Sequence, residues 1–259
     1  MSKEESRFRG RARDYSRYRP GYPVELATHL ERVGLLPAYG VVADVAAGTG
    51  KLSALFLDRG HVVYGVEPNG EMRAAAERAF LGRENFHSVN GTAEATGLPA
   101  GSVDLVTVGQ ALHWFDLKLA REEFLRVLRP AGAVAVVWNE REEAEGFGAA
   151  YQRIVDTYKR ERRPVSCKSI TPGMLNAFFA PEPPGWLRVR QGCHYTLEGI
   201  IGRMRSSSYM PYEPDEAHDM IAALEKAFDA HAANGQVELE YQAVMCYGRF
   251  RAVEATVQA

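Results

Sequence analysis

The feature that most constrains the fold is an alternation of short β-branched segments with amphipathic helical segments over the first 140 residues. Buried strands are predicted at residues 41–45, 62–66, 86–89, 103–108 and 133–138. Helical patterns separate them at residues 51–59, 71–81 and 117–128. Strands that alternate with helices pair in parallel through right-handed crossovers. We therefore expect a doubly wound, mostly parallel α/β sheet that binds its ligand at the carboxyl ends of the strands.

The second half of the chain has a different pattern. Helical periodicity is found at residues 145–163, 197–204 and 215–233, and strand-like alternation at residues 186–195 and 236–250. Two late strands that flank a helical segment predict an antiparallel edge of the sheet. We predict a single domain over residues 1–259, in which residues 14–140 bind the cofactor and residues 196–235 form a helical cap inserted before the last strand.

Composition and charge exclude several functions. The chain has 31 Lys and Arg against 33 Asp and Glu, a net charge of −2 that is unsuited to non-specific nucleic-acid binding. No apolar run approaches the roughly 20 residues of a membrane helix, and no signal peptide is expected. Cys167, Cys193 and Cys246 lie far apart, which argues against a disulfide framework or a structural zinc site. We predict a cytoplasmic protein with no metal, nucleic-acid or membrane partner.

The loop DVAAGTGK at residues 44–51 joins the first strand to the first helix. Small residues let the backbone approach a ligand closely, and a helix N-terminus favours negative charge. A phosphate-binding P-loop requires GxxxxGK[ST], but Val45 replaces its first glycine and Leu52 follows the lysine. That class of loop is therefore excluded.

Two other ligand classes fit the same loop. A dinucleotide fingerprint, GxGxxG, finds its first two glycines in Gly48 and Gly50, with the tolerated Ala54 at the third position. In the other class an acidic residue stands at the strand end before the glycines, as Asp44 does. Such an acid would repel a pyrophosphate and attract an ammonium group.

Two later segments add to this pattern. Glu67 lies 23 residues after Asp44, directly beyond the second strand, where a carboxylate can accept hydrogen bonds from both ribose hydroxyls of an adenosine ligand. Residues 90–94 (NGTAE) follow the third strand and offer an acid and backbone amides to an adenine edge. The three segments together indicate a site for an adenosine compound.

These segments resemble the motifs of class I S-adenosylmethionine-dependent methyltransferases. VVADVAAGTGKL is similar to the first motif of that family, and VYGVEPNGEM to the second. NGTAEATGLPAGSVDLVTVGQALHWFD resembles the adenine segment with the fourth strand, and FLRVLRPAGAVAVV the helix and fifth strand. The opening ARDYSRYRPGYP and the HWFD segment are similar to small-molecule enzymes related to trans-aconitate methyltransferase. The resemblance covers residues 14–138.

The resemblance implies a seven-stranded sheet with an antiparallel last strand and the use of S-adenosylmethionine. It implies that Asp44 lies near the methionine ammonium, directly or through water, and that Glu67 binds the ribose. Residues 68–69 and 93–94 would surround the adenine, and residues 15–19 would close over the methionine end. The implied cofactor-binding residues are Asp44, Ala47, Gly48, Gly50, Glu67, Pro68, Asn69, Ala93, Glu94, Gln110, Tyr15, Tyr18 and Arg19.

The chain departs from the family pattern at two positions. The first motif usually reads D-x-G-x-G-x-G, and Ala46 replaces its first glycine. The additional methyl group bears on cofactor affinity rather than on the fold. Ala131 replaces a usual glycine at a turn remote from the methyl donor.

Methyl transfer by SN2 displacement needs alignment of the reactants and exclusion of water rather than a metal. A carboxylate acceptor needs only positioning, whereas a hydroxyl or amine can require a base. His113, directly after the fourth strand, is the candidate base or hydrogen-bond donor, with packing as the alternative role. Candidate substrate-binding residues are Trp114, Asn139, Arg205, Ser207 and Tyr209.

Several alternatives stay open at this point. The six arginines at positions 7, 9, 11, 13, 17 and 19 could form an RNA-binding arm. We favour a solvated segment in which only Arg19 is recruited, to a carboxylate. The leading hypothesis is a methyltransferase for a small acidic or hydroxylated molecule; the alternatives are a non-catalytic S-adenosylmethionine-binding domain and an NAD-dependent oxidoreductase, which Asp44 disfavours. The sequence does not identify the methyl acceptor or the oligomeric state.

Overall fold

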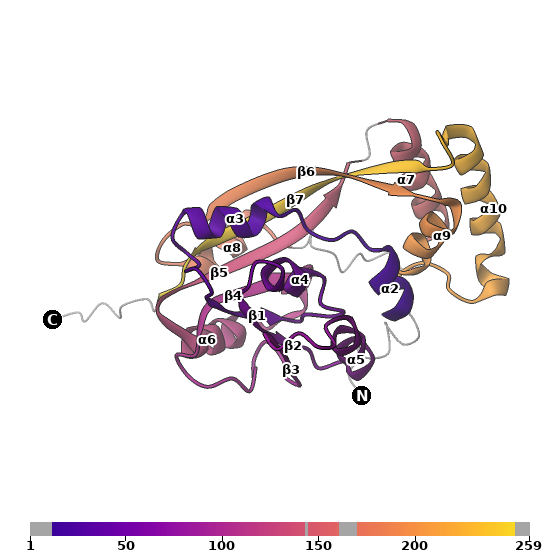
Figure 1. Ribbon diagram of the computed structural model, residues 1–259. Coiled ribbons are helices and arrows are strands. Elements are labelled where there is room, and N and C mark those ends of the chain that lie inside the picture. The colour runs from indigo at the N-terminus through magenta and orange to yellow at the C-terminus, as the bar shows by residue number, and fades with distance from the viewer. Residues whose placement is uncertain (1–11, 143–144, 161–169, 252–259) are drawn as a thin grey trace. The chain divides into compact units, whose positions relative to one another are not determined.

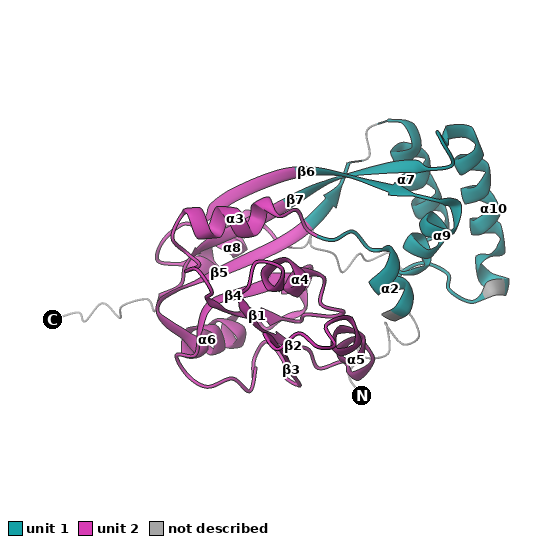
Figure 2. Cartoon of the chain, in the orientation of Figure 1, with its two compact units in different colours: residues 1–21, 139–164, 190–243 teal, residues 22–138, 165–189, 244–259 magenta. Residues whose placement is uncertain are grey.

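The structure is a computed structural model that describes residues 12–142, 145–160 and 170–251. Cys167 and the arginines at positions 7, 9 and 11 lie outside the described residues. The chain divides into two units, coloured separately in Figure 2. Unit 1 comprises residues 1–21, 139–164 and 190–243, and unit 2 comprises residues 22–138, 165–189 and 244–259.

The strands of the described residues form one seven-stranded sheet with the order β3-β2-β1-β4-β5-β7-β6 (Figure 1). Their bounds are β1 Val41–Val45, β2 Val62–Val66, β3 Phe86–Val89, β4 Val103–Gly109, β5 Leu128–Arg141, β6 Gly185–Tyr195 and β7 Val237–Arg249. Strands β3, β2, β1, β4 and β5 pair in parallel. The order reverses between β1 and β4, as expected of a doubly wound sheet.

Strand β7 runs antiparallel to β5. The Phe250 amide donates to the Gly132 carbonyl at 3.0 Å, and the Glu142 amide donates to the Glu240 carbonyl at 2.9 Å. Residue numbers therefore fall along β7 as they rise along β5. The predicted fold class is confirmed: a mostly parallel seven-stranded sheet with an antiparallel last strand and a helical insertion before it.

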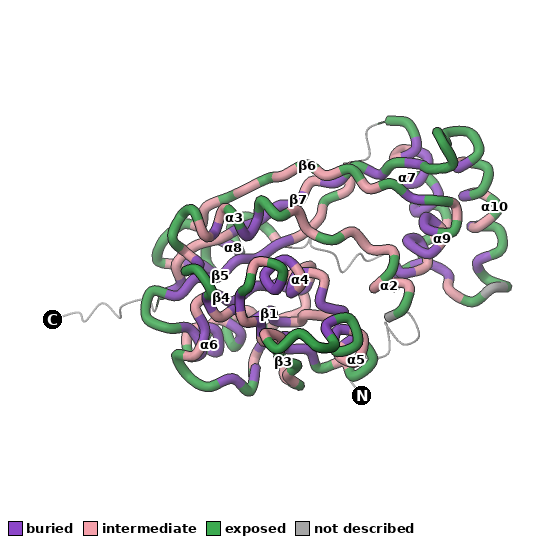
Figure 3. The backbone as a smooth tube through the Cα atoms, in the orientation of Figure 1, coloured by how far each residue is buried: buried purple, intermediate pink, exposed green. Residues whose placement is uncertain are grey.

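Unit 2 holds the parallel strands and the helices α3 Glu25–Arg32, α4 Lys51–Leu57, α5 Gly70–Ala79, α6 Leu117–Val127 and α8 Pro172–Phe179, with the short 3₁₀ helix η1 Leu112–Trp114. Its central strands β1, β2 and β4 are mostly buried (Figure 3). Val42, Val63, Val106 and Val134 are each 0% exposed. The β-branched residues that predicted strands thus fill the interior of the sheet, where burial of apolar surface favours folding.

Unit 1 contains α2 Ala12–Tyr18, α7 Gly146–Tyr158, α9 Leu197–Arg205 and α10 Pro214–His231. A second hydrophobic cluster joins α7, α9 and α10 through Tyr151, Ile200, Met204, Met220 and Leu224. Helix α10 contributes the apolar stripe expected from its sequence, since residues 217, 220, 224 and 228 are buried. The helices predicted between the two late strands, α9 and α10, are therefore present.

Some boundaries differ from the prediction. Strand β5 begins at Leu128 rather than at residue 133, so the expected turn at residues 129–132 lies within the strand. The register between β4 and β5 shifts between Val103 and Leu105, which is a bulge, and Ala131 has a φ of 67° there. Helices α2, α3 and α8 were not expected from hydrophobic periodicity because each is short, at seven or eight residues.

Candidate functional site

The candidate site is the carboxyl edge of the parallel strands in unit 2. Strand β1 pairs with β2 on one side and with β4 on the other, so the segments that follow these three strands lie at the same edge. The order of the strands reverses at this point, which is where open α/β sheets bind ligands. Three segments meet here: residues 46–50, residues 67–69 and residues 110–113.

The loop at residues 46–50 has three residues in the left-handed region, with φ values of 56° at Ala46, 58° at Gly48 and 84° at Gly50. A Cβ at Gly50 would overlap the Phe80 ring, whereas a Cβ at Gly48 would have no heavy atom within 4 Å. The Ala47 amide donates to the Val66 carbonyl at 3.1 Å and ties the loop to β2. The loop is therefore packed at Gly50 and faces open space at Gly48.

Asp44 lies at the end of β1 and is only 1% exposed. One of its oxygens accepts a hydrogen bond from Ser53 Oγ at 2.6 Å, and the other from Thr107 Oγ1 at 3.3 Å. Burial raises the pKa of Asp44 to about 7, because desolvation disfavours the charged form. Protein hydroxyls therefore already hold both carboxylate oxygens.

Glu67 connects the first two segments of the site. Its Oε2 accepts a hydrogen bond from the Gly48 amide at 2.9 Å, and its Oε1 accepts one from the Asn69 amide at 2.8 Å. The residue is 8% exposed, and burial raises its pKa against the opposing effect of these two amides. A carboxylate has about four lone-pair sites, so each oxygen can still accept a ligand hydrogen bond.

The remaining predicted adenine residues have varied surroundings. Pro68 is exposed, and Asn69 caps α5 through hydrogen bonds from the amides of residues 71 and 72. Ala93 is 3% exposed and belongs to the hydrophobic core of unit 2. Glu94 accepts a hydrogen bond from the Asp116 amide at 3.0 Å. The structure thus places all of them after β2 and β3, and it uses the Asn69 side chain as a cap.

Gln110 and His113 follow β4. Gln110 has a φ of 60°, and its amide donates to the Val137 carbonyl at 2.8 Å. A small pocket is lined by residues 110–113, 136–138 and 170. Burial lowers the pKa of His113 to about 4, so the imidazole is neutral at pH 7. The His113 and Trp114 rings lie 4.7 Å apart between centroids.

The other predicted site residues belong to unit 1. They are Tyr15, Tyr18, Arg19, Asn139, Arg205, Ser207 and Tyr209. The structure brings Arg19 and Ser207 together, with Arg19 Nη2 3.1 Å from Ser207 Oγ. Among the described residues, Arg19 donates to the neutral groups of Ser206 and Ser207, so its recruitment to a carboxylate stays a prediction.

Three of these residues make contacts with other partners. Tyr18 donates to Glu198 Oε1 at 2.7 Å, and its ring covers Gly202. The side chain of Asn139 donates through Nδ2 to the Gly21 carbonyl at 3.0 Å. Its Oδ1 accepts a hydrogen bond from Gln191 Nε2, also at 3.0 Å. Arg205 donates to the Tyr212 carbonyl at 2.9 Å. The remaining predicted residues of unit 1 that lie together are Arg19, Ser207 and Tyr209, because both Arg19 and Tyr209 hydrogen-bond to Ser207.

Sequence reasoning missed Arg203, which completes this group. Arg203 is 5% exposed and donates to Ser207 Oγ and to Tyr241 Oη, both at 3.2 Å. The spacing of four residues between Arg203 and Ser207 places both on one helical face, a signal that was present in the sequence.

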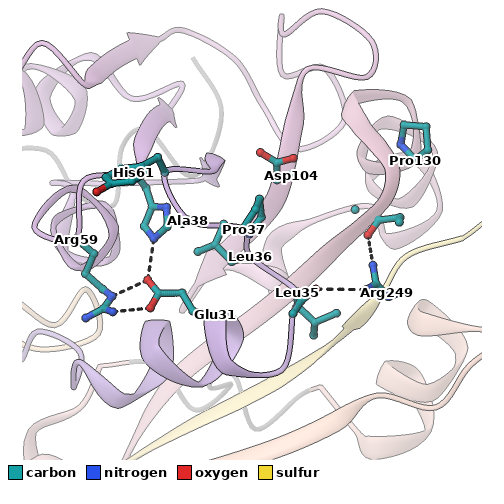
Figure 4. Close-up of a pocket in the computed structure, with 14 residues that line it drawn as sticks. Glu31, Leu35, Leu36, Pro37, Ala38, Arg59, His61, Asp104, Pro130 and Arg249 are labelled. Atoms are coloured by element: carbon teal, nitrogen blue, oxygen red, sulfur yellow. Dashed lines mark hydrogen bonds and ion pairs between the residues drawn. The ribbon is translucent and has the colours of Figure 1, made fainter.

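A separate cavity of about 720 Å³ lies at the opposite end of β1 and β4, near their first residues (Figure 4). Its charged side chains already have partners in the protein. Glu31 accepts from Arg59 and His61, Asp104 accepts from the Val41 amide, and Arg249 donates to the carbonyls of residues 34 and 131. We therefore place the site at the carboxyl edge and not in this cavity.

The part of the chain that the structure describes has no cluster of three or more His, Cys, Asp or Glu side chains arranged to hold a metal ion. In the same residues, none of the helices is both long and apolar enough to cross a membrane.

The comparisons with known proteins find methyltransferases. The profile of a family described as "Methyltransferase domain" matches residues 43–136, which span the strands β1 to β5. An uncharacterized methyltransferase of Mycobacterium tuberculosis is 42% identical over 134 residues, covering 51% of this chain and 52% of the relative. The chain thus matches about half the length of that relative.

Two further comparisons extend over most of the chain. An uncharacterized methyltransferase-like protein of Schizosaccharomyces pombe is 28% identical over 248 residues, covering 91% of this chain and 92% of the relative. The structure of a candidate type II methyltransferase from Anaeromyxobacter dehalogenans has a TM-score of 0.70 at 23% identity, covering 91% of this chain and all of that one. The fold is therefore shared over nearly the full length.

Proposed function

Because the chain belongs to the class I S-adenosylmethionine-dependent methyltransferases, we propose that it transfers a methyl group from S-adenosylmethionine to a small-molecule acceptor bearing a carboxylate or a hydroxyl. The observation that carries the proposal is the position of Glu67. Its carboxylate lies at the carboxyl end of β2, joined to the Gly48 amide of the loop after β1. An acid there suits the two ribose hydroxyls of an adenosine compound.

The residues of unit 2 fit such a compound. The Gly48 position faces open space, so the backbone of residues 47–50 is accessible to the ligand. The hydroxyl of Thr49 is buried and has no hydrogen-bond partner among the described residues, which leaves a polar group available at the loop. Asp44 is held by Ser53 and Thr107, and each of its oxygens keeps a lone pair for the ammonium, directly or through water.

Residues 68–69 and 93–94 would surround the adenine, with Ala93 supplying an apolar surface from the core. Gln110 would face the reacting end, since it follows β4 directly. Tyr15 and Tyr18 of unit 1 are assigned to the methionine end by family resemblance, and Arg19 is assigned to a carboxylate. The domain assignment, with residues 196–235 as a cap, also remains part of the proposal.

When bound, S-adenosylmethionine supplies a methyl group activated by its sulfonium, which an acceptor displaces in a single SN2 step. His113 is neutral at pH 7 and lies beside the pocket at residues 110–113. A neutral imidazole can accept a proton from a hydroxyl acceptor or hydrogen-bond to a carboxylate acceptor. We assign it this role, with Trp114 and Asn139 as substrate-binding residues.

Calorimetric titration of the purified chain with S-adenosylmethionine, S-adenosylhomocysteine and NAD tests the cofactor. We expect binding of the two sulfur compounds in the micromolar range, typical of enzyme cofactors, and none of NAD. Binding of NAD alone would support an oxidoreductase. Cofactor binding followed by no methyl transfer to any member of a panel of small acids and alcohols would support a non-catalytic binding domain.

A further inference from the structure

Unit 1 contains two guanidinium groups that share one neutral acceptor. Arg203, on α9, is 5% exposed, and Arg19, directly after α2, is half-buried. Arg19 Nη2 donates to Ser207 Oγ at 3.1 Å, and Arg203 Nη1 donates to the same oxygen at 3.2 Å. Two positive groups are therefore held within hydrogen-bonding distance of a single serine oxygen.

The other acceptors of both groups are also neutral. Arg19 donates to Ser206 Oγ at 3.0 Å and to the Ser206 carbonyl at 3.4 Å. Arg203 donates to Tyr241 Oη at 3.2 Å. Among the described residues, neither guanidinium has a carboxylate partner. Both arginines nevertheless stay charged at neutral pH, because guanidinium pKa values are far above it.

Other buried charges of the described residues are compensated in different ways. Glu123 is 9% exposed, and its carboxylate accepts two hydrogen bonds from Arg126 at 2.7 Å. The carboxylates of Asp44 and Glu67 are held by hydroxyls and by backbone amides. A buried charge without a counter-charge is unfavourable, and the cluster in unit 1 presents two cations and, among the described residues, no anion.

We propose that Arg19 and Arg203, together with Tyr209, bind the carboxylate of a small organic acid. Tyr209 is 37% exposed and lies at the border of the cluster, whose Arg203 and Ser207 are 5% and 2% exposed. Burial raises the pKa of Tyr209, but the charges of Arg19 and Arg203 lower it below its ordinary value.

The surroundings favour an organic carboxylate over a phosphate. The donors are two planar guanidinium groups, which match both carboxylate and phosphate, so the choice between the two anions rests on the groups around them. Aromatic rings lie beside both, with the Arg19 guanidinium 5.2 Å from the Tyr15 ring and that of Arg203 6.0 Å from the Tyr241 ring. Such rings suit the carbon skeleton of an acid.

Calorimetry of the cofactor-free chain tests the site without requiring turnover. The probes are succinate and citrate, with succinamide as the uncharged comparator and inorganic phosphate as the competing anion. We expect succinate or citrate to bind and succinamide not to bind. Arg203→Met should lower the carboxylate association constant at least about tenfold. Arg153→Met, which changes an exposed arginine of α7, is the matched control and should have no effect.

Thermal unfolding distinguishes a binding role from a structural one. Arg203→Met removes a buried charge that has no carboxylate partner, so its Tm without ligand should equal or exceed that of the unaltered chain. Citrate or succinate should raise the Tm of the unaltered chain and not that of the variant. Arg19→Met provides a second test with the same expectation if Arg203→Met does not fold.

Absence of carboxylate binding by the unaltered chain would overturn the site, as would binding of phosphate alone. A variant that loses stability but binds carboxylate normally would show that Arg203 is structural. Failure of the proposed function would be a different result. In that case the chain would bind carboxylates but would neither bind S-adenosylmethionine nor transfer its methyl group.

Discussion

In unit 2 the buried carboxylates at the edge of the sheet are held by groups of the protein itself, whereas in unit 1 two guanidinium groups donate to neutral acceptors. Glu67 receives two backbone amides, and Asp44 receives two hydroxyls. Arg19 and Arg203 share Ser207. The difference indicates a site already formed in unit 2 and a site completed only by an anion in unit 1.

The largest expected effect is the loss of stability of unit 2 in Gly50→Ala. Its φ of 84° disfavours any side chain, and the added methyl would overlap the Phe80 ring. We expect a loss of about 2–5 kcal/mol in the free energy of unfolding, measured by urea denaturation. Gly82→Ala is the matched control, with a φ of 82° and no atom within 4 Å, and should lose only the backbone contribution.

Glu67→Ala tests the ligand-binding role of the same edge. The variant removes the acceptor of the Gly48 and Asn69 amides and the partner of the ribose. We expect S-adenosylmethionine affinity to fall by about 1–3 kcal/mol in a calorimetric titration. Glu84→Ala, at an exposed position of unit 2, serves as the control. Unchanged affinity in Glu67→Ala would remove this residue from the ribose site.

His113→Gln separates the effect on cofactor binding from the effect on turnover in unit 2. The substitution keeps a hydrogen-bonding side chain but removes the imidazole. We expect turnover to fall about tenfold while S-adenosylmethionine binding stays the same, because His113 is assigned to the acceptor. Steady-state kinetics and calorimetry together decide this, and an unaffected rate would assign His113 to packing.

Ala46→Gly addresses the departure from the family motif. Ala46 has a φ of 56°, a conformation that glycine adopts without strain. We expect the free energy of unfolding to rise by about 0.5–1 kcal/mol. Ala54→Gly, on α4, should instead lower it, since glycine is unfavourable in a helix. A loss of stability in both variants would contradict the claim that the backbone at Ala46 is strained.

The smallest expected effect is that of pH on the role of His113. Burial lowers its pKa to about 4, below the value of about 6.5 for an exposed histidine. The neutral imidazole therefore persists above pH 5 and is lost only as the pH falls toward 4. The ratio of turnover between the unaltered chain and His113→Gln should stay constant from pH 5.5 to 8. A ratio that changes near pH 6.5 would contradict the burial argument.

The sheet of unit 2 was largely predictable from the sequence. Strands β1, β2 and β3 have the predicted bounds. For β1 and β2 the reason is that largely buried β-branched runs bounded by turn residues have few other solutions. Helix α8 was missed, although Thr171 caps it and Pro172 occupies its first turn, which are readable start signals. The bulge in β5 at residues 128–133 depends on pairing with β4 and has no local signal.

The cluster in unit 1 was only partly predictable. Arg205, Ser207 and Tyr209 were chosen as candidate substrate residues, but Arg203 was not. Residues 203 and 205 are separated by about 200° around a helix, so they face opposite ways, and the sequence alone does not say which face is buried. Contacts such as Tyr18 with Glu198 join residues 180 positions apart and depend on the whole fold.

The most direct test is a crossed titration of Glu67→Ala and Arg203→Met with S-adenosylmethionine and with citrate. We predict that Glu67→Ala loses affinity for S-adenosylmethionine and still binds citrate as the unaltered chain does. Arg203→Met should lose citrate and retain S-adenosylmethionine. If both variants lose both ligands, or if Arg203→Met binds citrate normally, the assignment of the two ligands to the two units is contradicted.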